Sequence, residues 1–373
     1  MTTPVLQHSD PIRNAGASRL LALDAFRGFD MLAMLLVATA FDPNFYPEQL
    51  RHRGWNDGAH GATFCDLIFP WFLFIVGVAI PFSMEAGRGR SLSMTWRLLS
   101  AARRGLMLYL LGCLIHAART GIVTVLTWDI LQHIGAAYLI AVAVYHLPLS
   151  GRLGYVAVVL LAKYALLRFI PYPGAGEVLW TREENLQCWL TANVLGWFGA
   201  LQNVLPGSTV VVMGLMAGSW LRTRASQPYA AIGGLLIGGA ALVGLSWVWQ
   251  VDFPYSKDYF TSSYALLGAG SGCVLLAWFY WCCDVRRLTR AAVFVIPGRN
   301  AIAMYVAMSV LSPMVLHRWR LAGDPRTLAQ ALTDFLSASF GGMAGAWLYT
   351  AAYVGAGWLL TCWLHRRGAY LKV

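Results

Sequence analysis

Runs of about twenty mostly apolar residues recur along the chain, and they limit the possible folds more than any other sequence feature. The apolar core of a bilayer is about 30 Å thick, so a helix that crosses it needs roughly twenty largely apolar residues. Of the 373 residues 58% are hydrophobic and 12% are charged, whereas about 25% of residues in an average soluble domain are charged. The sequence therefore predicts a helical protein that crosses a membrane many times.

These runs predict about ten membrane-spanning helices. The predicted spans are residues 22–41, 66–85, 104–119, 131–148, 153–171, 206–222, 229–250, 262–282, 298–316 and 341–364. The expected fold is an all-α polytopic membrane protein with one transmembrane domain at 21–365, between a tail at 1–20 and a tail at 366–373. The aromatic, amphipathic segment 172–205 is expected to lie on the outer face of this domain.

Lysine and arginine residues are distributed unequally between the two sides of the predicted bundle. If the N-terminus is cytoplasmic, we count 17 of the 28 basic residues on the inner side, 8 on the outer side and 3 within spans. Cytoplasmic loops of membrane proteins carry an excess of basic residues, so this bias predicts that both termini are cytoplasmic. The bias also accounts for the net charge of +11, so no nucleic acid is expected as a partner.

Two histidines and two carboxylates gather between the first and second predicted spans. His52 and His60 lie in the external loop 41–65, with Asp57 nearby and Asp66 at the head of the second span. Histidine is the side chain best suited to proton transfer near neutral pH, so this loop is the strongest candidate for catalysis. Asp66 could cap the helix or orient a histidine. The four side chains could also hold a metal, but we expect none.

Charged residues inside the first predicted span form a second candidate group. Asp24, Arg27 and Asp30 are spaced at i, i+3 and i+6, so the arginine can reach either carboxylate across one turn. A charge inside a span is costly and is usually paired or functional. The pattern leaves open whether these residues form a structural ion pair or bind a substrate.

Two more polar groups lie at the outer ends of predicted spans. Asp129, Gln132 and His133 begin the fourth span, where Gln132 could orient a ligand or a catalytic histidine, or could form an interhelical hydrogen bond. Lys257 precedes the eighth span within a tyrosine-rich stretch, which is also typical of an interfacial anchor. The sequence leaves open whether Gln132 and Lys257 act on a substrate or have a structural role, as a hydrogen bond between helices and as an interfacial anchor.

Arginines on the inner side form a possible site for phosphates. Arg299 and Asn300 begin the ninth predicted span, close in sequence to Arg286, Arg287 and Arg290. Guanidinium groups bind phosphates well. The positive-inside rule explains the same arginines without a ligand and is favoured by the sequence alone.

Six segments resemble, in order, the transmembrane acetyltransferases related to heparan-alpha-glucosaminide N-acetyltransferase. The segments are LDAFRGFDM (23–31), QLRHRGW (49–55), DLIFPWFLFIVGVAIPFS (66–83), ILQHIGAAY (130–138), KDYFTSSY (257–264) and GRNAIAMYV (298–306). The most specific part is the DLIFPWFLF block that follows an H-x-x-W element. They are spread over most of the chain, so the resemblance concerns the whole domain.

This resemblance implies a bacterial inner-membrane enzyme that takes acetyl-CoA from the cytoplasm and acetylates the amine of a glucosamine-type sugar on the periplasmic side. It points to His52 as the general base or the acetyl acceptor, with Asp66 orienting it. The stretch from Trp55 to Asp66 is longer than is usual in the family, so His60 remains an alternative.

Further site residues are predicted with this mechanism. The predicted substrate-binding residues are Trp55, Gln132, His133, Lys257 and Asp30. The predicted acetyl-CoA-binding residues are Arg27, Arg103, Arg104, Arg287, Arg299 and Asn300. The expected partners are an amino sugar or short oligosaccharide and the lipid bilayer, and the chain could form a homodimer.

Two other functions fit the sequence. A secondary transporter would use the intramembrane Asp24, Arg27 and Lys163 as coupling residues. An acetyltransferase that acts on hydroxyl groups of a cell-envelope glycan would use the same histidine chemistry but form an ester.

Overall fold

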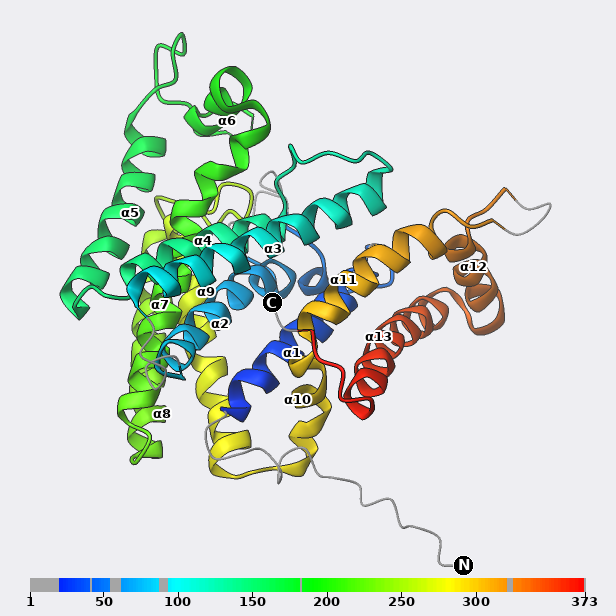
Figure 1. Cartoon of the computed structure of the whole chain (residues 1–373). Helices are drawn as coiled ribbons and strands as arrows, with labels where there is room; N and C mark the ends of the chain where they lie inside the picture. Colours follow the sequence, from blue (N-terminus) through cyan, green and yellow to red (C-terminus); the bar gives the residue numbers. More distant parts are fainter. Residues whose placement is uncertain are drawn as a thin grey trace, which may run out of the picture.

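The computed structural model is helical throughout the part of the chain that it describes (Figure 1). The described residues are 20–40, 42–53, 62–86, 93–181, 183–320 and 325–371. Within these ranges the β contacts are limited to one bridge, between Arg320 and Thr327. The predicted all-α class is confirmed.

The α-helices follow the predicted spans closely. They are α1 Leu21–Val37, α2 Phe64–Ala86, α3 Met94–Thr120, α4 Ile130–Val144, α5 Leu149–Phe169, α6 Leu186–Leu190, α7 Val204–Thr223, α8 Pro228–Trp249, α9 Ser262–Tyr280, α10 Ala292–Arg299, α11 Ala301–Leu311, α12 Leu328–Phe340 and α13 Gly342–Arg366. Short 3₁₀ or π segments are η1 Glu48–Leu50, η3 Thr191–Leu195, η4 Gly196–Asn203, η5 Trp281–Val285, η6 Thr289–Ala291 and η7 Ser312–Leu316.

Within the described ranges, six helical segments are long and apolar enough to cross a membrane. They are Phe64–Met84, Thr95–Thr120, Leu149–Phe169, Leu186–Thr223, Pro228–Trp249 and Ser262–Val285. The pair Thr289–Arg299 and Ala301–Leu316, bent by 63°, adds a seventh if it forms one broken span. The chain is thus a multi-pass membrane protein, while the count of ten and the sides of the termini remain predictions.

Close contacts between backbones fix the packing of α2 on α7. A Cβ atom on Gly214 would lie 2.2 Å from the carbonyl oxygen of Phe74, and one on Gly218 would lie 2.4 Å from that of Val78. Only glycine leaves room for this approach, so the GLMAG stretch of α7 is a helix-packing motif, as the sequence predicts.

A similar contact joins α1 to α10 near the start of α1. A Cβ atom on Gly298 would lie 1.7 Å from the carbonyl oxygen of Asp24. The carboxylate of Asp284 accepts hydrogen bonds from the backbone N–H groups of Leu21 (3.1 Å) and Ala22 (2.7 Å), which satisfies two free donors at the helix start. These contacts hold the charged part of α1 beside the end of α10.

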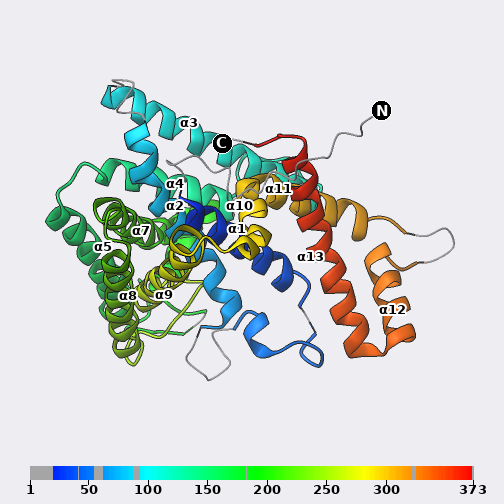
Figure 2. The same cartoon turned by 90° about the horizontal axis from the view of Figure 1, so that it is seen from below.

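The helices divide into two flanks around α1 and α2. Figures 1 and 2 show α5, α7, α8 and α9 together on one side, with α12 and α13 on the other. The stretch before η1 is anchored to the α13 flank. There the Tyr46 hydroxyl donates to the Ala346 carbonyl (2.8 Å) and the Trp347 indole donates to the Phe45 carbonyl (3.2 Å). This anchoring positions the following loop, which carries His52.

Candidate active site

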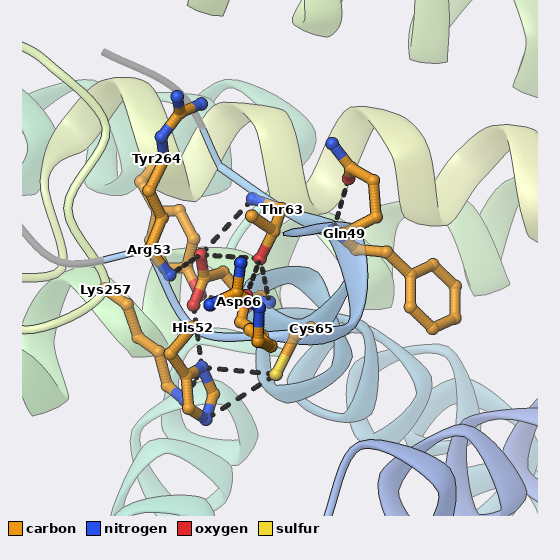
Figure 3. Close-up of polar contacts among 10 residues, drawn as sticks. Gln49, His52, Arg53, Thr63, Cys65, Asp66, Lys257 and Tyr264 are labelled. Carbon is orange, nitrogen blue, oxygen red and sulfur yellow. Dashed lines mark hydrogen bonds and ion pairs between the residues drawn. The ribbon is translucent and has the colours of Figure 1, made fainter. Parts of the chain in front are cut away.

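His52 and Asp66 form a hydrogen-bonded pair where the first loop meets the start of α2. His52 Nδ1 lies 2.8 Å from Asp66 Oδ1 (Figure 3). The histidine side chain is 60% exposed, whereas that of the aspartate is 5% exposed. The pair therefore consists of a solvent-exposed imidazole that is hydrogen-bonded to a buried carboxylate.

The second oxygen of Asp66 is held by three donors. Its Oδ2 accepts from the Thr63 hydroxyl (2.9 Å), the Thr63 N–H (3.2 Å) and the Arg53 N–H (3.3 Å). An ionised carboxylate can only accept hydrogen bonds, so the proton in the pair with His52 sits on Nδ1. His52 Nε2 is then the acceptor nitrogen of the ring, which is the arrangement of a histidine general base.

The loop that presents His52 is tied to the start of α2, and the start of α2 is tied in turn to α9. The N–H of Phe64 donates to Gln49 Oε1 (3.0 Å), and the Tyr264 hydroxyl of α9 donates to the backbone carbonyl of Asp66. These bonds fix the imidazole and the carboxylate relative to each other, which catalytic geometry requires.

Lys257 and Cys65 also contact the imidazole (Figure 3). Lys257 Nζ lies 3.3 Å from each ring nitrogen of His52, and Cys65 Sγ lies 3.3 Å from Nδ1 and 3.6 Å from Nε2. Burial lowers the pKa of Lys257 from its ordinary value, and the Asp66 carboxylate opposes part of this change. The sequence predicted Lys257 as a site residue but not Cys65, which its position next to Asp66 could have suggested.

A cavity of about 110 Å³ extends from His52 into the bundle, and we call it the central cavity. His52, Lys257, Tyr305 and Asp30 line it together with apolar side chains of α1, α2 and α4. Asp30 is fully buried, and neither carboxyl oxygen has a hydrogen-bond partner among the described residues. The central cavity is thus apolar except for these few groups.

A second cavity of about 260 Å³, the arginine cavity, lies toward the other end of α2. Arg27, Arg104 and Arg299 line it, with the first residues of α11. Arg27 NH1 lies 3.7 Å from Asp24 Oδ1, and Arg299 Nε lies 3.8 Å from Asp24 Oδ2. The arginine and central cavities share Phe72, Leu131 and Ile134 as lining residues, so they meet at these three side chains.

An outer cavity of about 610 Å³ opens on the other side of His52. Arg51, Arg119, Ser309 and Tyr353 add polar groups to a lining that is otherwise mostly apolar. Helix α1 and the residues just after it line all three cavities in sequence order: Arg27 lines the arginine cavity, residues within 30–37 the central cavity and residues within 34–40 the outer cavity. The three cavities therefore follow one another along α1.

Two predicted substrate-binding residues lie outside these cavities. The Gln132 side chain accepts from the Asp129 N–H (3.2 Å) in the capping box of α4. His133 is buried, with ring centroid distances of 5.1 Å to Phe69 and 5.8 Å to Phe260, and its Nε2 faces Gly207. Both side chains pack against helices, and neither contacts His52 in the described part of the chain.

Three predicted acetyl-CoA-binding residues do not line the arginine cavity. Arg103 and Arg287 are exposed, whereas Asn300 is buried and donates to the Ala369 carbonyl (3.1 Å). The predicted residues Trp55 and His60 lie outside the described residues.

Within the described ranges, neither a group of metal ligands nor the intramembrane Lys163 forms part of this site. Among the described residues, no group of three or more His, Cys, Asp or Glu side chains could hold a metal ion. Lys163 is buried and donates to the side-chain oxygens of Gln187 and Asn203. This lysine thus links α5 to the segment before α7.

Comparisons with known proteins agree with the resemblance of the six sequence segments. The family model described as heparan-alpha-glucosaminide N-acetyltransferase, catalytic, matches residues 19–246. Heparan-alpha-glucosaminide N-acetyltransferase of Mus musculus is 24% identical over 382 residues, which cover 84% of this chain and 56% of the mouse protein. The protein of the same name from Homo sapiens is 33% identical over 128 residues, covering 33% of this chain and 18% of the human protein.

The chain spans little more than half the length of the mouse relative, so the relatives' whole activity is not transferred by similarity alone. The family match, in contrast, includes α1 to α7 and with them the His52–Asp66 pair and two of the three arginines of the arginine cavity. Because this match covers well over half of the chain, the protein belongs to the heparan-alpha-glucosaminide N-acetyltransferase catalytic family.

Proposed function

We propose that this protein transfers an acetyl group from cytoplasmic acetyl-CoA to the amine of a glucosamine-type sugar on the periplasmic side of a bacterial inner membrane. The observation that carries the proposal is the series of cavities along α1, with three arginines at one end and His52 on Asp66 at the other. In this proposal the chain has ten spans and both termini are cytoplasmic.

The arginine cavity suits the phosphates of coenzyme A. Three guanidinium groups line it, and the Asp24 carboxylate lies close to two of them, those of Arg27 and Arg299. The first turn of α11 contributes the positive end of a helix, which also favours anions. The pantetheine arm would then pass Phe72, Leu131 and Ile134 to bring the thioester to His52.

The chemistry follows from the tautomer of His52. Nε2 removes a proton from the sugar amine, whose nitrogen attacks the carbonyl carbon of the thioester, and the Asp66 carboxylate stabilises the resulting imidazolium. The C–S bond breaks, and the thiolate of coenzyme A leaves and takes up a proton. The Lys257 ammonium, 3.3 Å from the ring, is placed to stabilise the oxyanion.

A two-step route uses the same atoms. His52 Nε2 first attacks the thioester carbonyl carbon, the C–S bond breaks and the thiolate of coenzyme A leaves and takes up a proton. The sugar amine then attacks the acetyl carbonyl, the bond to Nε2 breaks, and the amine gives up its proton as the amide forms. Radiolabelled acetyl groups retained on the protein in the absence of a sugar, together with ping-pong kinetics, would support this route. Direct transfer leaves no label on the protein.

The test of the proposed function is acetyl transfer by the purified protein in detergent. Incubation with radiolabelled acetyl-CoA and glucosamine should give a product that resists mild base, because an amide is stable where an ester is hydrolysed. His52→Ala should abolish the product, whereas His146→Ala, which changes an exposed histidine outside the three cavities, should not. A base-labile product would support the glycan O-acetyltransferase instead.

A transporter would behave differently in the same preparation. Reconstituted vesicles that accumulate unmodified glucosamine without acetylation would refute the enzyme proposal. The oligomeric state, proposed as a homodimer on the basis of the glycine-rich helices, is tested by the mass of the detergent-solubilised protein.

A further inference from the structure

Asp30 is the feature of the central cavity that the proposed chemistry leaves unused. It lies in the middle of α1, is fully buried, and lines the same cavity as His52 and Lys257. Both of its carboxyl oxygens are without a hydrogen-bond partner among the described residues. A buried polar group without a partner costs free energy, so a carboxyl group kept in such a place requires a ligand or water to complete it.

The surroundings of Asp30 define what that ligand can be. Met31, Met34 and Ile68 share the cavity wall, so the space beside the carboxyl is apolar. The ligand must therefore be a mostly apolar chain with an isolated hydrogen-bonding group. A sugar, which carries hydroxyl groups on all sides, would leave most of them unpaired there and suits the outer cavity better, since the outer cavity is larger and has more polar side chains in its lining.

We propose that Asp30 binds the amide of the pantetheine arm that lies nearest the thioester, an inference that rests on the proposed use of acetyl-CoA. The arm is a mostly apolar chain that carries two secondary amides and one hydroxyl group, which matches a mostly apolar passage with a few separate polar groups. Because His52 and Asp30 line one cavity, a thioester carbonyl at His52 brings the nearest amide to the depth of Asp30.

The contact does not depend on the protonation state of Asp30. An ionised carboxylate accepts a hydrogen bond from the amide N–H, and a protonated carboxyl group can also donate one to the amide C=O. In both states Asp30 selects a donor that has an amide at this distance from its thioester. Asp30 is thus a specificity-determining residue for the acyl donor.

The test measures kcat/KM of the wild-type protein and of Asp30→Ala with three acetyl donors. The donors are acetyl-CoA, S-acetyl-N-acetylcysteamine, which keeps the amide nearest the thioester, and S-propyl thioacetate, which has no amide. Asp30→Ala should lower kcat/KM roughly 3- to 100-fold for the first two, the range expected for a lost hydrogen bond to a neutral or a charged carboxyl group. For S-propyl thioacetate kcat/KM should stay within a factor of about 2.

Binding measurements supply a second readout. Titration calorimetry should show that Asp30→Ala weakens the binding of coenzyme A but not that of adenosine 3′,5′-bisphosphate, which lacks the arm. Asp252→Ala is a matched control, because this carboxylate is exposed and lines none of the three cavities. If Asp30→Ala does not fold, Asp30→Leu, an apolar side chain of similar size, removes the same contact and should show the same pattern across the three donors.

The outcomes separate this inference from the proposed function. Equal losses with all three donors would overturn the inference and point to a contact with the acceptor amine or to a structural role. Unchanged kcat/KM with acetyl-CoA would overturn it as well. A wild-type protein that transfers acetyl groups from none of the donors would instead refute the proposed function.

Discussion

Replacing Asp66 by asparagine tests the tautomer on which the catalytic proposal depends. The two carboxyl oxygens of Asp66 differ, since Oδ2 accepts three donors and Oδ1 accepts the Nδ1–H of His52. In Asp66→Asn the amide oxygen keeps the three donors, and the amide NH₂ then faces Nδ1. That nitrogen must now accept a hydrogen bond, so the proton moves to Nε2, where no base remains.

The expected loss is large in rate and small in stability. A wrong histidine tautomer in a comparable hydrogen-bonded pair lowers kcat by roughly 10⁴-fold, and we expect a loss of about 10³- to 10⁴-fold here. The free energy of unfolding should fall by about 1 kcal/mol, because a neutral acceptor replaces a charged one while the three donors stay paired.

The assay is the initial rate of acetyl transfer with saturating acetyl-CoA, beside thermal unfolding of the same preparation. Asp66→Ala is the companion variant. It leaves the N–H groups of Arg53 and Thr63 without their acceptor and should lower the free energy of unfolding by about 1–3 kcal/mol. An Asp66→Asn variant that keeps more than about a tenth of the wild-type kcat would refute the tautomer argument.

Three further predictions address the neighbours of this pair. Because burial lowers the pKa of Lys257, its ammonium should be lost at a lower pH than that of an exposed lysine. The transfer rate should fall as pH rises through this lowered pKa. In Lys257→Arg the fall should occur at a higher pH, and in Lys257→Met it should be absent. A pH–rate profile of each protein checks this. Ile134→Trp should block the junction of the two inner cavities and abolish transfer from acetyl-CoA but not from S-propyl thioacetate, as parallel assays would show. Cys65→Ala should keep at least about half of the wild-type rate, because the proposed reaction forms no covalent bond between the acetyl group and the Cys65 sulfur. A rate of zero would indicate that the thiol is the nucleophile.

The pairing of His52 with Asp66 could be predicted from the sequence, whereas the direction in which individual side chains of a helix point could not. A helix turns by about 100° per residue, so adjacent positions point to different sides. Ile130, Leu131 and Ile134 line the central cavity, while Gln132 and His133 between them face α3 and α7. Polar character made these two residues candidates, but the apolar neighbours reach the cavity.

Helix α10 was also missed, since the ninth predicted span, 298–316, begins only where α10 ends and corresponds to α11 with η7. Pro297 has no N–H to donate to the carbonyl of Val293, and the indole of Trp358 donates to this carbonyl instead (3.1 Å). The chain bends by 63° at Asn300. The Pro297–Gly298 pair was a visible breaker signal; the tryptophan from α13 that satisfies the freed carbonyl was not.

Helix α1 explains how two distant sites can serve one reaction. Its residues pass from Arg27 in the arginine cavity to Asp30 and then Met34 beside His52, a rise of about 10 Å along the axis. The carboxylate of Asp284 and the contact with Gly298 hold the start of this helix against the rest of the bundle. In the proposed reaction, a donor bound by its phosphates at Arg27 would meet His52 at a position set by α1, so the register of this helix would determine where along the bundle the acetyl group is transferred.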